Sequence, residues 1–204
     1  MAVIDTFARS AAAKFILFGL LLLPLLYLLV WVLLGDIGSD PALAVVEYLA
    51  VVAFNLLLVT VSITPVRRLT GFSWMARFRR MLGLYTYFYA SLHVAAYLLF
   101  LADWQNIQAD LLKRPYMFVG LGAFLLLSVL AITSNKWSMR RLAKKWVVVH
   151  RLVYLIILLV LVHFVWQERA DYFSSFIYFS IILVLFVARF GLSGFQAGVR
   201  RKIF

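Results

Sequence analysis

Long apolar runs alternate with short polar segments along the chain. Six of these runs are long enough to cross a bilayer, and they cover residues 14–34, 42–63, 81–101, 116–133, 146–166 and 172–190. About 20 apolar residues in an α-helix cover ~30 Å, the thickness of the hydrocarbon layer. Each run is expected to be helical, because an open strand leaves its backbone unpaired in lipid. The pattern predicts an all-α integral membrane bundle of six transmembrane helices, with a single domain over residues 1–204.

The composition supports a membrane protein and excludes other classes. Hydrophobic residues make up 66% of the chain and charged residues 14%, whereas a soluble domain has about 45–50% and 25%. The chain has no cysteine, which excludes disulfides and thiolate metal sites. The formal net charge is +12, but the basic residues lie in short segments between apolar runs, where they meet lipid headgroups. We therefore expect the lipid bilayer, and no nucleic acid, as the partner of this charge.

The connecting segments fall into two groups by charge. Segments 35–41, 102–115 and 168–171 hold six of the eight acidic residues and three of the twenty Lys and Arg residues. Segments 65–80 and 134–145 hold five Lys or Arg residues each. Cytoplasmic segments of membrane proteins are enriched in Lys and Arg. The charge pattern therefore predicts that both termini are cytoplasmic.

All three histidines lie inside apolar runs, where a polar side chain is costly and marks a functional site. His93 is in the third run, and His150 and His163 are in the fifth. Both runs lead outward in the predicted topology, so His93 lies ~20 Å along its helix and His163 lies ~20 Å beyond His150. We expect His93 and His163 at one depth in the outer half of the bilayer. His150 is expected alone, near the cytoplasmic side.

Two imidazoles at one depth suit the axial coordination of a haem iron, for which histidine is a common ligand. Helix bundles often hold such sites in their cores. A zinc site is disfavoured, because three nitrogens at two depths cannot form a tetrahedron around one ion. A proton relay would need an acidic residue near the middle of a span, and no run has one there.

Several alternatives stay open at this point. The histidines could only hydrogen-bond their neighbours, or the chain could be a histidine-dependent proton or metal transporter, or a structural membrane anchor. In addition, thirteen residues of regular helix turn His150 and His163 about 140° apart. They therefore serve two sites, or the helix between them is irregular.

Basic residues near the cytoplasmic ends of the runs are candidates for binding an anionic group. Arg151 follows His150 and could meet a haem propionate, because a guanidinium forks onto a carboxylate; the alternative is that it reaches the headgroups. Five further arginines could hold a flavin phosphate or a quinone headgroup, or only set topology and contact lipid: Arg67, Arg68, Arg77, Arg79 and Arg80. Three glycines could let a flat ring or a neighbouring helix approach: Gly83, Gly120 and Gly122.

Two blocks of the chain resemble a known family. Residues 62–98 are SITPVRRLTGFSWMARFRRMLGLYTYFYASLHVAAYL, and residues 145–167 are KWVVVHRLVYLIILLVLVHFVWQ. Their TPxRR, RRxLGL, YxxxH and HRLxY patterns are similar to those of the MsrQ family, formerly YedZ. This family belongs to the ferric reductase-like transmembrane superfamily. The length and the six-span plan agree with it over the whole chain.

The resemblance implies a membrane subunit that passes electrons from the respiratory chain to MsrP. MsrP is a periplasmic molybdenum-cofactor enzyme that reduces methionine sulfoxide in oxidised proteins, so catalysis lies on this partner. The resemblance also implies haem b and FMN as cofactors, a heterodimer with MsrP, and the bacterial inner membrane as location. Haem-ligand roles fall on His93, His150 and His163. The superfamily often has a second histidine on the third span, and this chain has none at that position, near residues 79–81.

On this basis we expect His93 and His163 to be the two axial ligands of one low-spin haem b. His150 is expected to serve an inner site with a non-histidine or water as the opposite ligand, or to hydrogen-bond a flavin or quinone. Electrons are expected to enter on the cytoplasmic side or from quinol and to leave at the periplasmic face. The chain has no G-x-G-x-x-G motif after a strand-like segment and only a short tail after the sixth run. It is therefore expected to need a quinol or a separate flavin reductase as donor.

Overall fold

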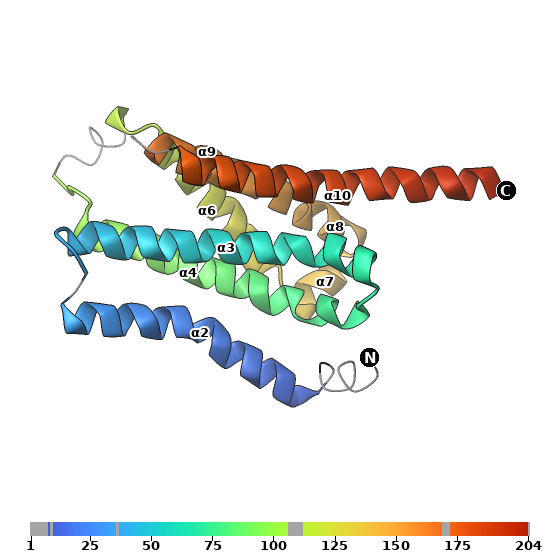
Figure 1. Ribbon diagram of the computed structural model, residues 1–204, viewed down its shortest axis with the longest axis horizontal. Coiled ribbons are helices and arrows are strands. Elements are labelled where there is room, and N and C mark those ends of the chain that lie inside the picture. The colour runs from blue at the N-terminus through green and yellow to red at the C-terminus, as the bar shows by residue number, and fades with distance from the viewer. Residues whose placement is uncertain (1–7, 9, 36, 106–111, 169–171, 204) are drawn as a thin grey trace.

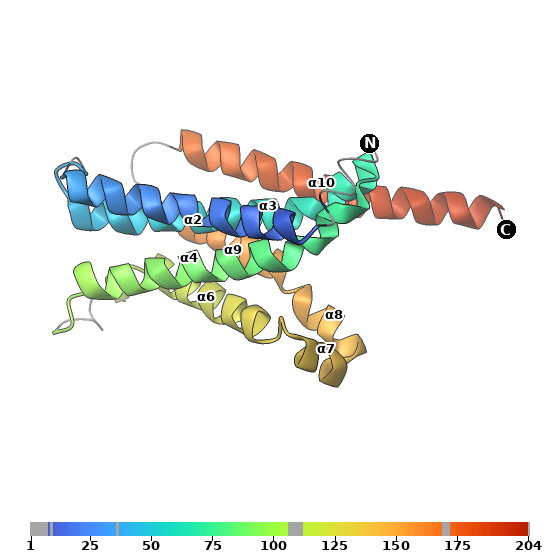
Figure 2. The same cartoon turned by 90° about the horizontal axis from the view of Figure 1, so that it is seen from below.

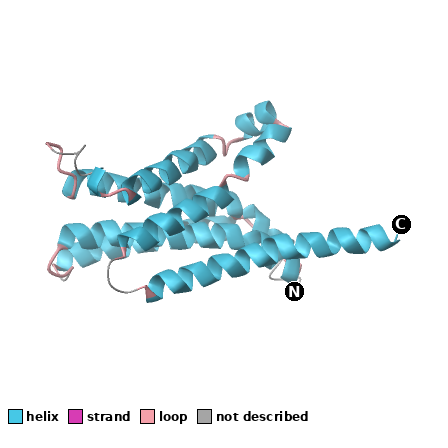
Figure 3. Ribbon diagram, turned by 90° about the horizontal axis from the view of Figure 1, so that it is seen from above, coloured by secondary structure: helices cyan, strands magenta, loops and turns pink. Residues whose placement is uncertain are grey.

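The structure is a computed structural model that describes residue 8 and residues 10–35, 37–105, 112–168 and 172–203, with side chains described up to residue 191. The two termini, whose cytoplasmic side is predicted from charge, lie outside the described residues. All regular elements in the described part are helices (Figure 3). They are α2 (Ala11–Leu34), α3 (Pro41–Thr70), the 3₁₀-helix η1 (Ser73–Arg77), α4 (Arg79–Phe100), α6 (Tyr116–Ile132), α7 (Lys136–Leu142), α8 (Lys144–His150), α9 (Val153–Gln167) and α10 (Phe173–Ile203).

Several described helices are long and apolar enough to cross a bilayer. Four qualify singly: α2, α3, the segment Lys144–Gln167 that includes α8 and α9, and Phe173–Gly191 of α10. α6 and α7 together would make a fifth, although they meet at an angle of 94°. The 22-residue α4 does not qualify, because its tyrosines and His93 make it less apolar. The prediction of an all-α, multi-pass membrane protein is confirmed.

Two helices extend beyond the apolar runs that predicted them. α3 continues past Pro65 to Thr70, and the residue after it, Gly71, has a left-handed backbone with φ 76°. This conformation closes a helix and suits glycine, which has no side chain to clash. α10 continues past residue 190 to Ile203. Apolar composition therefore marked the membrane-length part of each helix but not its end.

The predicted connecting segment 134–145 contains a helix of its own. α7 begins after Asn135, whose side chain accepts a hydrogen bond from the Ser138 N–H at 2.8 Å. This is the capping interaction that asparagine makes at helix starts. Between α7 and α8, Ala143 has φ 46°, a positive value that is uncommon for a residue with a side chain. The segment is therefore a helical corner.

The fifth apolar run is not one regular helix. α8 ends at His150 and α9 begins at Val153. Arg151 and Leu152 form a tightened turn between them, in which the Leu152 N–H donates to the carbonyl three residues back at 3.0 Å. This 3₁₀ geometry changes the rotation per residue. The helix is therefore irregular between His150 and His163, which was one of the two alternatives.

The long helices form a bundle in which successive members run in opposite directions (Figure 1). The connections 66–80 and 134–145 lie at one end, which we call the basic end because segments 65–80 and 134–145 together hold ten Lys and Arg residues. Figure 2 shows α7 and α8 projecting at this end. The described parts of the connections between α2 and α3 and between α4 and α6 lie at the other end, which we call the opposite end. The two charge groups of connecting segments thus occupy different ends of the bundle.

α2 contains Pro24 and bends along its length (Figure 1). Tyr89 of α4 is fully buried and reaches this region. Its hydroxyl donates to the Leu21 carbonyl at 2.7 Å and accepts from the Leu25 N–H at 3.2 Å. In a regular helix those two backbone groups bond each other, so the hydroxyl is inserted into the α2 ladder. The Tyr85 hydroxyl also donates to α2, to the Phe18 carbonyl at 3.0 Å.

Buried side chains form two clusters. One joins α2, α3 and α4 and includes Leu49 and Leu82, and the other joins α3, α6, α9 and α10 and includes Phe54 and Ile156. α3 contributes to both clusters. It therefore connects two halves of the bundle that meet around a cavity.

Candidate functional site

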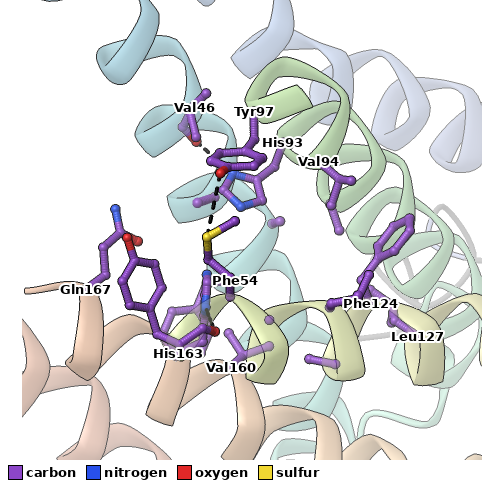
Figure 4. A pocket seen from close by; sticks show the side chains of 18 of the residues that line it. Val46, Phe54, His93, Val94, Tyr97, Phe124, Leu127, Val160, His163 and Gln167 are labelled. Atoms are coloured by element: carbon purple, nitrogen blue, oxygen red, sulfur yellow. Dashed lines mark hydrogen bonds between the residues drawn. The ribbon is translucent and has the colours of Figure 1, made fainter. Parts of the chain in front are cut away.

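A cavity of about 380 Å³ lies between α3, α4, α6 and α9. Its size is within the range of about 300–1,000 Å³ that is usual for ligand sites. Most of its walls are aliphatic or aromatic, as Val46, Phe124 and Leu127 illustrate in Figure 4. His93 comes from α4 and His163 from α9, and both line this cavity. The tertiary structure therefore brings together the two histidines that were predicted to pair.

Each of the two imidazoles is oriented by a backbone carbonyl from another helix. His93 Nδ1 is 2.9 Å from the Val46 carbonyl of α3, and His163 Nδ1 is 2.8 Å from the Tyr116 carbonyl of α6. A carbonyl only accepts, so Nδ1 of each ring is the protonated nitrogen. Nε2 then carries the free lone pair in both rings. This is the usual arrangement of a histidine that binds a metal, with the second nitrogen held by a carbonyl.

The separation of the two rings fits coordination of one metal between them. A metal–imidazole bond is about 2.0–2.1 Å, and the ring radius adds roughly 1 Å on each side, so two opposite ligands have centroids about 6 Å apart. The centroids of His93 and His163 are 6.5 Å apart, with an angle of 76° between the ring planes. Crossed planes are compatible with this arrangement, since each plane can contain the metal–nitrogen axis. The pair thus fits the axial ligands of a haem iron.

The cationic and amide side chains of the cavity, Arg114 and Gln167, lie toward one end. Gln167 is the last residue of α9 and Arg114 lies just before α6, so both belong to the opposite end of the bundle. Toward the basic end the lining residues include Leu57, Leu127 and Ile156. The cavity therefore suits a ligand with an apolar body and a charged or polar edge. Among the described residues that line it, Arg114 is the one cationic side chain.

His150 has different surroundings and does not line this cavity. Its Nδ1 is 3.2 Å from the carbonyl of Trp146 on its own helix, and its Nε2 is 3.3 Å from Ser134 Oγ. The ring stacks on the Trp146 indole, with centroids 3.9 Å apart. Arg79 is close enough to interact with it electrostatically. The structure thus separates His150 from the other two histidines, as its predicted depth required.

The predicted arginines lie at the basic end, and none of them lines the cavity. Arg79 is half-buried and donates to Thr64 Oγ1 at 3.4 Å. It is within electrostatic range of Arg67 and Arg189 as well as of His150. A partly buried cluster of positive charge therefore forms around Arg79. Arg189 was not identified from the sequence, because it lies more than a hundred residues from the motif.

The remaining predicted arginines make separate contacts. Arg68 donates to a carbonyl of α10 at 3.2 Å, and Arg77 donates to the Ala8 carbonyl at 3.2 Å. Arg80 and Arg151 are exposed. Arg151 does not line the cavity that holds His93 and His163.

Sequence reasoning missed several residues of the cavity. Arg114, Tyr116 and Gln167 carried no motif, and Val46 takes part through its backbone, which no side-chain pattern reveals. Gly120 was noted only as a place where a flat ring or a neighbouring helix could approach. The structure shows that the approaching ring is the imidazole of His163, since a Cβ at Gly120 would lie 2.7 Å from His163 Nδ1.

Comparison with known proteins identifies the family of this chain. The family described as Ferric reductase like transmembrane component matches residues 47–161, which run from α3 into α9. The chain is 46% identical over 151 residues to the protein-methionine-sulfoxide reductase heme-binding subunit MsrQ of Xanthomonas oryzae pv. oryzae, covering 73% of this chain and 69% of that one. The subunit of the same name from Xanthomonas axonopodis pv. citri gives the same values, and that of Xanthomonas campestris pv. campestris is 45% identical over the same shares.

The chain belongs to the MsrQ family of ferric reductase-like transmembrane proteins. The family that the two sequence blocks indicated is therefore confirmed. The ferric reductase match includes His93 and His150 and ends two residues before His163. The His93–His163 pair thus rests on the geometry of this MsrQ-family chain, independently of that match.

Proposed function

We propose that this chain is a haem b-binding, electron-transferring membrane subunit of a protein-methionine-sulfoxide reductase system. The observation that carries the proposal is the pair His93 and His163, two imidazoles on different helices with centroids 6.5 Å apart. They would be the axial ligands of one low-spin haem. The names of the relatives, which describe heme-binding subunits, support the same assignment.

The residues of the chain have distinct roles in this proposal. When bound, the haem supplies reversible one-electron chemistry. The carbonyls of Val46 and Tyr116 hold the Nδ1 protons, so that His93 and His163 present Nε2 to the iron. The apolar walls exclude water. Arg114, at the opposite end, would bind a propionate, because a guanidinium matches a carboxylate.

The spectrum of the purified protein tests this function. We expect a Soret band that shifts on reduction with dithionite, a low-spin signal in the oxidised form, and at least one haem per chain. A histidine-dependent transporter or a structural anchor would be colourless when purified with haem supplied during expression. A colourless, folded protein would therefore contradict the proposal.

His150 and the Arg79 cluster are proposed as a second, inner site. The location near Arg67 and Arg189 suits an anionic group such as a flavin phosphate, and FMN is the family's second cofactor by resemblance. His150 would bind a second haem opposite a non-histidine or water, or hydrogen-bond a flavin or quinone. Identification of the bound pigment by chromatography, with its ratio to protein, distinguishes these versions.

We propose that the whole chain forms one transmembrane domain of six spans with both termini in the cytoplasm of a bacterial inner membrane. The position of the basic segments at one end of the bundle supports this orientation. Reporter fusions at the C-terminus test it. A fusion that is active only in the periplasm would reverse the orientation.

The electron acceptor is proposed to be MsrP, a periplasmic molybdenum-cofactor reductase that forms a heterodimer with this chain and reduces methionine sulfoxide. Electrons would enter from quinol or a flavin reductase and leave at the opposite end, near the cavity. The test uses sealed vesicles of known orientation with MsrP on one side. Reoxidation of the haem only by MsrP at the cytoplasmic face would show the reverse direction.

A further inference from the structure

Gly120 of α6 lies against the face of the His163 imidazole. The imidazole lies across one turn of α6, with Nδ1 bonded to the Tyr116 carbonyl at 2.8 Å. Gly120 is four residues further along the same helix and therefore on the same face. A Cβ at this position would lie 2.7 Å from Nδ1, 2.7 Å from Cε1 and 3.1 Å from Nε2 of His163. These distances place the Cβ over the face of the ring, above its Nδ1–Cε1 bond, so the imidazole occupies the space of the missing side chain.

We propose that Gly120 is a positioning residue for His163, because only a residue without a side chain lets the imidazole reach both the Tyr116 carbonyl and a metal. This inference rests on the proposed haem function. Non-bonded heavy atoms are optimally about 3.5–4.0 Å apart, so contacts at 2.7 Å cannot be kept. A methyl group at Gly120 therefore has to move the ring.

The ring has little freedom to accommodate such a shift. Nδ1 is fixed by Tyr116 on α6, the same helix that would carry the new methyl group. Nε2 is fixed by the iron when haem is bound. Moving the ring away from α6 lengthens one of these two bonds and tilts the other. His93 is held by α3 instead, so the two axial ligands differ in their dependence on α6.

Gly122 provides a matched control. It lies on α6 two residues from Gly120, and a Cβ there would meet nothing within 4 Å. Replacement of either glycine by alanine improves intrinsic helix propensity by a similar amount. Any difference between Gly120→Ala and Gly122→Ala therefore reports the contact with His163.

The experiment compares the unmodified protein, Gly120→Ala and Gly122→Ala, each purified with haem supplied during expression. The readouts are haem-to-protein ratio, the absorption spectrum and the EPR spectrum of the oxidised form. We expect Gly122→Ala to match the unmodified protein. Gly120→Ala should lose most of its low-spin signal, through conversion to high spin or loss of haem. A Gly120→Ala spectrum and haem content equal to those of Gly122→Ala would overturn the inference.

A double variant covers the case in which Gly120→Ala does not fold. If the clash is with the imidazole, Gly120→Ala in a His163→Ala background should fold and bind haem as His163→Ala does. Failure of the double variant, with His163→Ala intact, would place the clash elsewhere and overturn the inference. An unmodified protein without haem would instead contradict the proposed function, so the two failures are distinguishable.

Discussion

The histidines at the two ends of the bundle have different surroundings. Near the opposite end, His93 and His163 come from separate helices, line one cavity, and keep Nε2 free because a carbonyl holds each Nδ1. At the basic end, His150 stacks on Trp146 and has a neighbour for each ring nitrogen within the chain. Placement in an apolar run is therefore common to all three, whereas the shared cavity and the carbonyl from another helix are found only for His93 and His163.

The difference shows what makes a membrane histidine a ligand. Burial alone favours any hydrogen bond that satisfies the ring. A ligand also needs a partner that orients Nδ1 and leaves Nε2 facing open space, together with a second ligand at the right distance. His93 and His163 each have Nδ1 held by a carbonyl, line the same cavity and have ring centroids 6.5 Å apart.

The largest effect is expected from replacing either paired histidine. His93→Ala or His163→Ala should abolish the low-spin haem signal, because one axial ligand then remains. Absorption and EPR spectra of the oxidised proteins measure this. The prediction fails if both variants keep full haem content and an unchanged low-spin spectrum.

His150→Ala should have a smaller and separate effect. The His93–His163 signal should persist, and only a pigment bound at the basic end, a second haem or a flavin, should decrease. Haem-to-protein and flavin-to-protein ratios, read beside the low-spin signal, measure the two sites independently. Loss of the main low-spin signal in this variant would contradict the prediction that His150 and the His93–His163 pair serve separate sites.

Arg114→Gln should weaken retention of haem without changing its axial ligands. A hydrogen bond to a charged group contributes about 1.5–3 kcal/mol, so haem should dissociate about 10-fold faster or more. Transfer of haem to an excess of apomyoglobin measures this rate. Lys113→Gln is the control, since Lys113 is exposed and does not line the cavity; equal rates in both variants would argue against a propionate at Arg114.

Tyr89→Phe should lower the thermal stability of the protein but leave the haem spectrum unchanged. The variant therefore tests a contact that stabilises the bundle without altering the residues that line the cavity. The Tyr89 hydroxyl bonds two backbone groups of α2, and its loss should cost about 0.5–1.5 kcal/mol. Thermal denaturation in detergent, followed by circular dichroism, measures the change. Tyr87→Phe is the control variant. The Tyr87 ring stacks on the Phe124 ring with centroids 5.7 Å apart, and the substitution keeps that ring. A similar loss of thermal stability in both variants would show that the hydrogen bonds of the Tyr89 hydroxyl to α2 have no particular effect.

The sequence by itself determined the class of the protein, its family and its approximate spans. The hydrophobic runs required membrane helices, because lipid leaves the backbone no other partner. Counting along the runs gave the relative depth of His93, His150 and His163, because the rise per residue of a helix is nearly constant. The separation of His150 from the other two could therefore be predicted.

The tertiary structure determined which side chains and backbone carbonyls of different helices contact one another at each depth. Periodicity gives the direction of a side chain only relative to its own helix axis, and packing sets how the helices are rotated against one another. The carbonyls of Val46 and Tyr116, the gap at Gly120 and the position of Arg114 all depend on that rotation. The irregular turn after His150 adds a rotation that a regular helix does not have. A histidine could thus be placed at its depth from sequence, but its carbonyl and its partner ligand came only from the packed bundle.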